Sequence, residues 1–274
     1  MRCRDNPNPG VLPPESHPQG KSYGQWAAAW WQWALALPAT AHPLFDTADC
    51  STGQSGEVWF LGGKFCNTGD PNCNGTAVRT CAVPAGKALF FPIVNTECST
   101  AEGNGSSEKE MRDCANSIID SAANLSAELD GKAFRELGIH QRYRSDSPLF
   151  TWTLASHDNV LKATGEPIAD GTSSAAVADG VHLMLAPLSP GPHTLHFHGE
   201  FPSFNFSLDI TYYLTVAAAR EQVIATIPVG DGPASLDINQ PTDKIYVANR
   251  WSSDVSVIDG AKKSTRSGRC RRGA

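Results

Sequence analysis

Eight short segments of this 274-residue chain alternate apolar with polar residues or are rich in β-forming residues, and turn residues separate them. They span 57–65, 77–83, 87–95, 127–134, 148–154, 180–188, 193–201 and 206–216. In the last, FSLDITYYLTV, the even-numbered residues are all apolar or aromatic and would share one face of a strand. This spacing predicts a mainly β fold, an antiparallel β-sandwich or jelly roll. Pro84-Ala85-Gly86 and Asp130-Gly131 are the expected hairpin turns.

The uncharged segment SYGQWAAAWWQWALALP, residues 22–38, holds four of the seven tryptophans. It is too short and too polar to cross a membrane, which takes about 20 apolar residues. Ser22 and Gln25 match a capping box, and Trp26, Trp30 and Trp33 recur at helical spacing. We therefore expect a helix whose tryptophan face packs on the sandwich. If its aromatic surface binds a ligand instead, such as a sugar, Trp26 and Trp31 are the residues expected to do so.

A second helix is predicted from about residue 107 to 124, with Met111, Cys114, Ile118 and Leu125 on one stripe. The chain then divides into a Pro-rich arm at 1–21, a sandwich domain with two helices at 22–217, and a different region at 218–274.

Six of the eight cysteines lie between residues 50 and 114, among Gly, Asn and Thr. These are Cys50, Cys66, Cys73, Cys81, Cys98 and Cys114. No C-x-x-C pair occurs among them, so a structural zinc site or a thioredoxin-type motif is poorly supported. The pattern predicts disulfides and therefore an extracellular or periplasmic protein, whose signal sequence would lie upstream of Met1.

The net charge of −6 is spread without a basic run before the last dozen residues. The sequence therefore shows no electrostatic surface for nucleic acid or an anionic membrane. An extracellular polymer, a surface, or a small ester or lactone are the partners that remain.

Five segments carry a resemblance to known proteins: SYGQWAAAWWQW, GQSGEVWFLGG, CAVPAGKALFFPIVN, LAPLSPGPHTLHF and SLDITYYLTV. Over about residues 11–217 the chain resembles a family of exported bacterial and archaeal proteins described only as hypothetical or signal-peptide proteins. The resemblance implies a β-sandwich and export, and it implies no mechanism.

Residues 223–261 contain IPVGDGP, KIYVAN and SVIDGA, and they resemble one YVTN-type β-propeller repeat. A propeller usually closes with four to eight blades, and only one copy is present. The basic tail KKSTRSGRCRRGA has no periodicity that would continue the repeat. We therefore expect a lone, incomplete blade from a truncated or frameshifted reading frame.

HTLHFHGEF is the best candidate for a metal site. On a strand, His196, His198 and Glu200 project to one face, and two imidazoles with a carboxylate can bind a divalent metal. His182 is a possible further ligand if its strand lies opposite. The single residue between His198 and Glu200 is too few for a cupin motif.

No catalytic residue is identified by the sequence, because its serine, lysine, histidine and aspartate patterns fix no nucleophile. We favour an extracellular β-sandwich module that binds a ligand or partner. The alternative is a secreted metal-dependent hydrolase of an ester or lactone, with a copper oxidase at the same histidines as a third choice.

Overall fold

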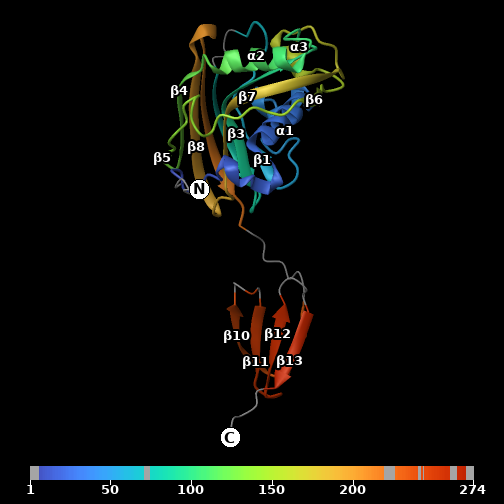
Figure 1. Ribbon diagram of the computed structural model, residues 1–274, viewed down its shortest axis with the longest axis vertical. Coiled ribbons are helices and arrows are strands. Elements are labelled where there is room, and N and C mark those ends of the chain that lie inside the picture. Colours follow the sequence, from blue (N-terminus) through green and yellow to red (C-terminus); the bar gives the residue numbers. More distant parts are fainter. Residues whose placement is uncertain are drawn as a thin grey trace. The chain divides into compact units, whose positions relative to one another are not determined.

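The computed structural model describes residues 6–70, 75–218, 226–239, 242 and 244–259, together with the backbone of 264–269. The chain divides into two compact units, residues 1–219 and 220–274. Within the described residues the first unit contains two β-sheets and three α-helices, and the second contains one β-sheet (Figure 1). The prediction of a mainly β fold is confirmed.

One sheet of the first unit has the strand order β1-β3-β7-β6. Its strands are Val58–Phe60 (β1), Ala88–Ser99 (β3), Ser173–Leu185 (β7) and Phe150–Thr153 (β6). The helix Tyr23–Ala36 (α1) covers one face of this sheet, and the second sheet packs on the other face. Most side chains of β3 and β7 are therefore buried on both faces, which explains their long apolar runs.

The other sheet has the strand order β2-β9-β8-β4-β5. Its strands are Thr76–Val83 (β2), Phe206–Val216 (β9), Gly191–Phe201 (β8), Ala123–Leu129 (β4) and Lys132–Ala133 (β5). Buried and more exposed residues alternate along β2, β8 and β9, because only one face of the sheet meets the core. Phe91 of β3 and Phe197 of β8 join the two sheets, with ring centroids 5.1 Å apart.

Two predictions about strand pairing are wrong. The sheets are mixed and not purely antiparallel, because β1 runs parallel to β3 and β2 runs parallel to β9. Pro84-Ala85-Gly86 joins strands of different sheets, so it is not a hairpin turn. Asp130-Gly131 does close the β4–β5 hairpin, and both residues have the positive φ of the tight two-residue turn.

Three α-helices belong to the first unit: Tyr23–Ala36 (α1), Glu108–Ile119 (α2) and Val160–Thr164 (α3). Capping boxes at Ser22 and Ser107 begin α1 and α2. The tryptophan-rich helix packs on β3, β6 and β7, as predicted. The second helix is shorter than predicted, because β4 already begins at Ala123. Short 3₁₀ turns lie at Pro14–Ser16, Pro18–Gly20, Ala39–Ala41, Pro43–Phe45 and Pro202–Phe204.

The described part of the predicted N-terminal arm packs on the first unit. Val11 is buried and bridges to Leu185, and the Asn8 amide donates a hydrogen bond to the Tyr143 hydroxyl. The arm therefore belongs to the domain that follows it.

Two disulfides join residues that the sequence analysis selected, Cys50 to Cys81 and Cys98 to Cys114. Cys66 is also disulfide-bonded, and Cys73 lies outside the described residues. Disulfides persist in oxidising compartments, so these bonds are consistent with such a location.

The second unit is an antiparallel sheet of Pro233–Asn239 (β10), Lys244–Asn249 (β11), Asp254–Asp259 (β12) and Ser264–Arg269 (β13). Four antiparallel strands are the number in a propeller blade. The strand β13 comes from the basic tail, whose sequence has no periodicity that would continue the repeat. Residues 264–269 nevertheless pair with β12 as the fourth strand of the sheet.

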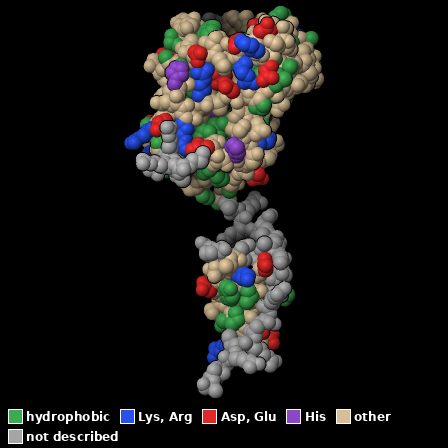
Figure 2. All heavy atoms as spheres, in the orientation of Figure 1, with side chains coloured by type: hydrophobic (Ala, Val, Ile, Leu, Met, Phe, Trp, Pro, Cys, Tyr) green, Lys and Arg blue, Asp and Glu red, His purple; other side chains and the backbone are tan. Residues whose placement is uncertain are grey.

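The described helices include none that is long and apolar enough to cross a membrane. On the face of the first unit that Figure 2 presents, basic and acidic side chains are interspersed and do not form blocks of one sign. This distribution agrees with the moderate net charge of −6.

Candidate functional site

A groove of about 490 Å³ lies between α1 and the segment that leads into β1. The aromatic side chains in its lining are Trp26, Trp33 and Phe60. The polar side chains are Lys21, Gln32, Ser55 and Glu57, all of them exposed. The groove therefore combines an apolar floor with a polar edge, which is typical of ligand sites.

Local backbone geometry brings the two walls of this groove together. Gly53 has a φ of +70°, which a side chain would disfavour. A Cβ atom at this position would also lie 2.8 Å from the Leu37 side chain and 3.0 Å from Trp33 Nε1. A glycine is thus needed for the 51–56 loop to approach the helix, and Trp33 Nε1 donates a hydrogen bond to the Thr52 carbonyl there.

The polar atoms of the groove residues are held in defined positions. Trp26 Nε1 donates to the Pro18 carbonyl, and the Lys21 ammonium lies 4.6 Å from the Trp26 ring centroid. The Gln32 amide donates to the Thr151 carbonyl, which leaves its oxygen as an acceptor. The groove can therefore offer aromatic surface together with hydrogen-bond donors and acceptors.

Of the two tryptophans predicted to bind a ligand, Trp26 lines this groove and Trp31 does not. Trp31 is 8% exposed and lines a different, smaller pocket. Trp30 is 2% exposed and donates its indole hydrogen to the Leu61 carbonyl, so it is a core residue. The four tryptophans of α1 thus have separate roles in packing and in pocket formation.

His196, His198 and Glu200 project from one face of β8, as alternation predicts. Their contacts are with each other and with neighbouring strands: His196 Nε2 lies 2.8 Å from Asp209 Oδ1, and His198 Nε2 lies 3.1 Å from Glu200 Oε1. The Asn124 amide donates to Glu200. Among the described residues no group of three or more His, Cys, Asp or Glu side chains is arranged to hold a metal ion. The geometry gives the predicted metal site no support.

His182, the possible further ligand if its strand lay opposite, cannot join that group. It belongs to β7, whose neighbours are β3 and β6 in the other sheet. The ring is fully buried, stacks on Phe90, and places Nδ1 3.0 Å from the Ser145 hydroxyl. Burial lowers the pKa of His182 to about 3, so it is a neutral core residue.

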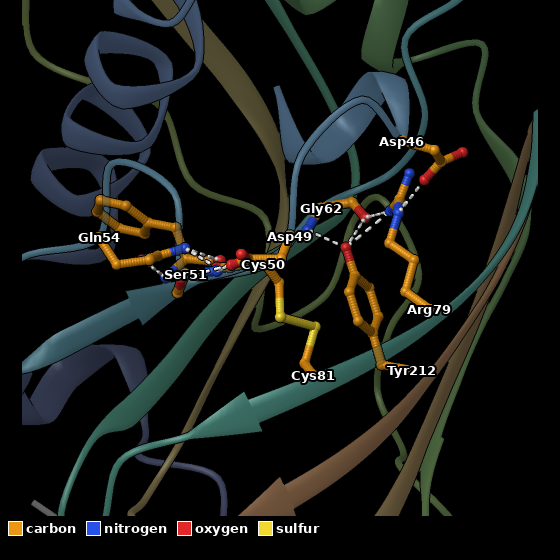
Figure 3. The surroundings of a disulfide bond; sticks show 10 residues. Asp46, Asp49, Cys50, Ser51, Gln54, Gly62, Arg79, Cys81 and Tyr212 are labelled. Carbon is orange, nitrogen blue, oxygen red and sulfur yellow. Dashed lines mark hydrogen bonds and ion pairs between the residues drawn. A yellow bond between two sulfur atoms is a disulfide. The ribbon is translucent and has the colours of Figure 1, made fainter. Parts of the chain in front are cut away.

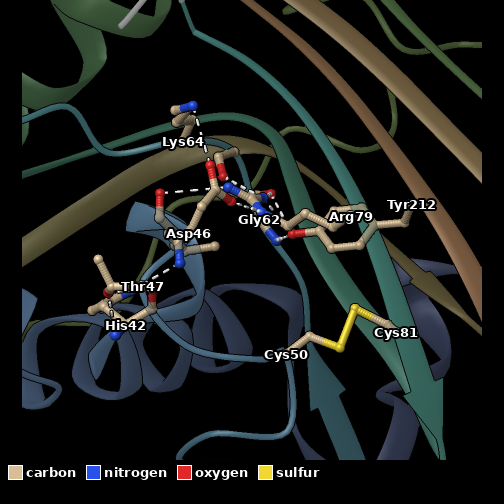
Figure 4. Close-up of polar contacts among 11 residues, drawn as sticks. His42, Asp46, Thr47, Cys50, Gly62, Lys64, Arg79, Cys81 and Tyr212 are labelled. Carbon is tan, nitrogen blue, oxygen red and sulfur yellow. Dashed lines mark hydrogen bonds and ion pairs between the residues drawn. A yellow bond between two sulfur atoms is a disulfide. The ribbon is translucent and has the colours of Figure 1, made fainter. Parts of the chain in front are cut away.

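A buried arginine, which the sequence analysis did not select, organises the loops near the Cys50–Cys81 disulfide (Figure 3). The Arg79 guanidinium donates to Asp46, to the Gly62 and Gly63 carbonyls, and to the Tyr212 hydroxyl. Asp46 also pairs with Lys64 at 3.1 Å (Figure 4). Through these hydrogen bonds Arg79 holds the loops at Asp46 and at 62–63 against β2 and β9. Because its donors are occupied by these groups, its role is structural.

A pair of carboxyl groups, with Glu97 buried and Glu102 half-buried, is the second feature that the sequence analysis missed. Glu97 of β3 is 8% exposed and accepts a hydrogen bond from Trp152 Nε1 at 3.2 Å. Burial, with a hydrogen bond to the Glu102 carboxyl, raises the pKa of Glu97 well above its ordinary value. The Ser99 hydroxyl donates to Glu102. A sequence motif for such a pair does not exist, because it depends on the packing of β6 against β7.

Comparison with known proteins assigns the chain to no family. No protein-family model and no curated protein matches it. A solved structure described as "PbICP-C in complex with falcipain-2" aligns with 59% of this chain and 99% of its own, at 10% sequence identity and a TM-score of 0.23. A likeness this low carries no argument about fold or function.

Proposed function

We propose that the first unit, residues 1–219, is an exported, disulfide-stabilised binding module whose ligand site is the groove beside α1. The observation that carries the proposal is the lining of this groove, where aromatic side chains and exposed polar side chains meet. Binding needs no catalytic group, and the histidines of the former metal candidate are already paired, His196 with Asp209 of β9 and His198 with Glu200. This favours binding over hydrolysis.

The ligand that fits best is an uncharged sugar unit of an extracellular polysaccharide. Its hydroxyl groups both donate and accept hydrogen bonds, as Gln32 and Ser55 do. Its C–H faces suit the aromatic surface of Trp26, which is apolar yet tolerates a wet edge. Lys21 and Glu57 balance each other in charge, so the groove does not select an ionic ligand.

Affinity electrophoresis in gels containing soluble β-glucan, xylan or glycol chitin tests the proposal. We expect retardation by at least one polysaccharide, and a loss of about tenfold or more in affinity for Trp26→Ala and Gln32→Ala, since each removes a stacking or hydrogen-bonding group. Trp251→Ala, at an exposed tryptophan of the second unit, is the matched control and should bind as the wild type does. Circular dichroism verifies the folding of each variant.

Equal retardation of wild type and Trp26→Ala would show that the groove is not the site. If none of the polysaccharides changed the mobility of the wild type, the proposed ligand class would be contradicted.

A further inference from the structure

The chain contains four segments of the form Asn-x-Ser or Asn-x-Thr in which x is not proline. This is the acceptor pattern for N-linked glycans in exported proteins. The four segments begin at Asn74, Asn104, Asn124 and Asn205. The pattern is short and also arises by chance, so it points to a modification site only where the fold presents the asparagine to solvent. Asn74 lies outside the described residues, and the other three can be compared.

Two of these asparagines are held by contacts within the fold. Asn104 is half-buried, and its side-chain oxygen accepts a hydrogen bond from the Ser99 backbone N–H at 3.1 Å. The Asn124 amide donates to the Glu200 carboxylate at 2.8 Å. Neither side chain is therefore free to enter another active site without a change in its surroundings.

Asn205 is presented differently, because it lies in the exposed connection between β8 and β9. It follows the 3₁₀ turn Pro202–Phe204, with a φ of 49° and a ψ of 43°. The residue is exposed, and its side chain has no hydrogen-bond partner within the part of the chain that the structure describes. Ser207, the hydroxyl residue of the same segment, is also exposed. The left-handed backbone favours asparagine whether or not it is modified, so a second observation is needed.

The phenylalanines on either side of Asn205 supply that observation. All eleven phenylalanines lie within the described residues, and of these only Phe204, at 60%, and Phe206, at 37%, are exposed. Both adjoin the buried Phe201, which is the register partner of Phe206 and lies 6.3 Å from Phe204 between ring centroids. Grouped apolar side chains at a surface, unlike scattered ones, indicate that something covers them. The C–H face of a sugar suits an aromatic ring in this way.

We propose that Asn205 is an acceptor for an N-linked glycan whose first sugar covers Phe204 and Phe206. The Asn205 Nδ2 atom attacks the anomeric carbon of a lipid-linked oligosaccharide, the bond from that carbon to the lipid phosphate oxygen breaks, and the amide proton leaves with the phosphate. The Ser207 hydroxyl is the group by which the transferase recognises the segment. The proposal rests on export, which is part of the proposed function, but not on the groove beside α1, whose lining contains none of these residues.

Secretion of the full chain from yeast behind a yeast signal sequence, followed by glycopeptide mapping, tests the attachment. We expect a glycan on Asn205. Asn205→Gln and Ser207→Ala should each remove it, whereas Ser207→Thr keeps the hydroxyl and should retain it. Asn104→Gln is the matched control and should leave the glycan content unchanged, because Asn104 is held in the fold.

A secreted chain without a glycan on Asn205, from a culture whose own secreted proteins are glycosylated, would overturn the proposal. Occupancy of Asn104 in place of Asn205 would overturn it as well. The yeast signal imposes export and the groove takes no part, so the result is independent of polysaccharide binding.

The covering of the phenylalanines has its own measurement. An endoglycosidase that leaves one N-acetylglucosamine on asparagine gives a chain that differs by a single sugar from the same chain made without glycan in a bacterial periplasm. We expect the single sugar to raise the melting temperature of the first unit by about 2–4 °C, the shift that one aromatic contact produces in a domain of this size. The rise should be smaller in Phe204→Ser. Equal melting temperatures with and without the sugar would show that it does not cover the rings.

Discussion

Glu97 shows how a single buried side chain can make this fold depend on pH. Its carboxyl accepts from Trp152 Nε1 and shares a hydrogen bond with the Glu102 carboxyl. Two ionised carboxylates in contact repel, so one must hold a proton, and burial selects Glu97. Because the pKa of Glu97 is raised by folding, its favourable contribution is complete below the ordinary pKa and is lost as pH rises through the folded value.

The variant Glu97→Gln tests this dependence. Glutamine keeps an acceptor for Trp152 and a donor for Glu102 but does not ionise. Relative to the wild type, its free energy of unfolding should increase as pH rises above the ordinary glutamate pKa, by up to about 1.4 kcal/mol per pH unit until the folded pKa of Glu97 is reached. Urea denaturation at several pH values measures the difference. Glu166→Gln, at an exposed glutamate, is the control. Parallel pH profiles for Glu97→Gln and wild type would refute the shared proton.

For single residues, the sequence predicted those roles that depend on neighbours close in the chain. Ser22 with Gln25 was identifiable as a capping box because both partners lie within one helical turn. Arg79, Glu97 and His182 acquire their roles from residues far away in the chain. No local pattern marks such groups, which is why His182 was assigned to a metal site that it cannot reach.

Among the elements, alternation predicted which segments are strands but not which strands pair. The burial pattern of β9 is the one that its sequence predicts, since one face meets the core and the other does not. Its parallel pairing with β2 joins segments more than 100 positions apart, and alternation contains no information on that choice. The same limit explains the error at Pro84-Ala85-Gly86, whose turn residues fit either a hairpin or a crossover between sheets.

The bond between Cys98 and Cys114 fixes the helix α2 to the end of β3. Cys98 packs with Met111, Ala115 and Val177 in a small cluster apart from the main core. The bond spans a sequence separation of 16 residues. By the loop-entropy relation, Cys98→Ala with Cys114→Ala should lower the free energy of unfolding by about 3 kcal/mol. Chemical denaturation without reductant measures this loss.

The matched comparison is Cys50→Ala with Cys81→Ala, whose bond spans a separation of 31 residues. Its loss should equal or slightly exceed that of the shorter loop, because loop entropy grows slowly with length. Unchanged stability in both double variants would mean that the bonds are unimportant for the folded state.

On the scale of the whole molecule, the chain consists of two compact units. The core of the first draws its members from residues 11–216. In the second, Val247 and Ile258 are buried, whereas Leu236, Ile238 and Trp251 are exposed. The sequence predicted this division near residue 218, since the character of the repeat-like segment differs from that of the sandwich. The observed boundary lies between residues 219 and 220.

Because the first unit has its own core and both described disulfides, we expect residues 1–219 to fold without the rest of the chain. The fragment should keep the thermal midpoint of the first unit in the full chain, together with any polysaccharide binding. Calorimetry and affinity electrophoresis measure these properties. Residues 1–200 form the matched control, since this shorter fragment lacks β9 and with it Leu208, Ile210 and Tyr212 of the core. Loss of three such buried side chains exceeds the few kcal/mol that large-to-small changes cost singly, so the control should not fold. If residues 1–219 behaved like this control, the second unit would be part of the folding unit of the first, and the independence argued from the core would be wrong.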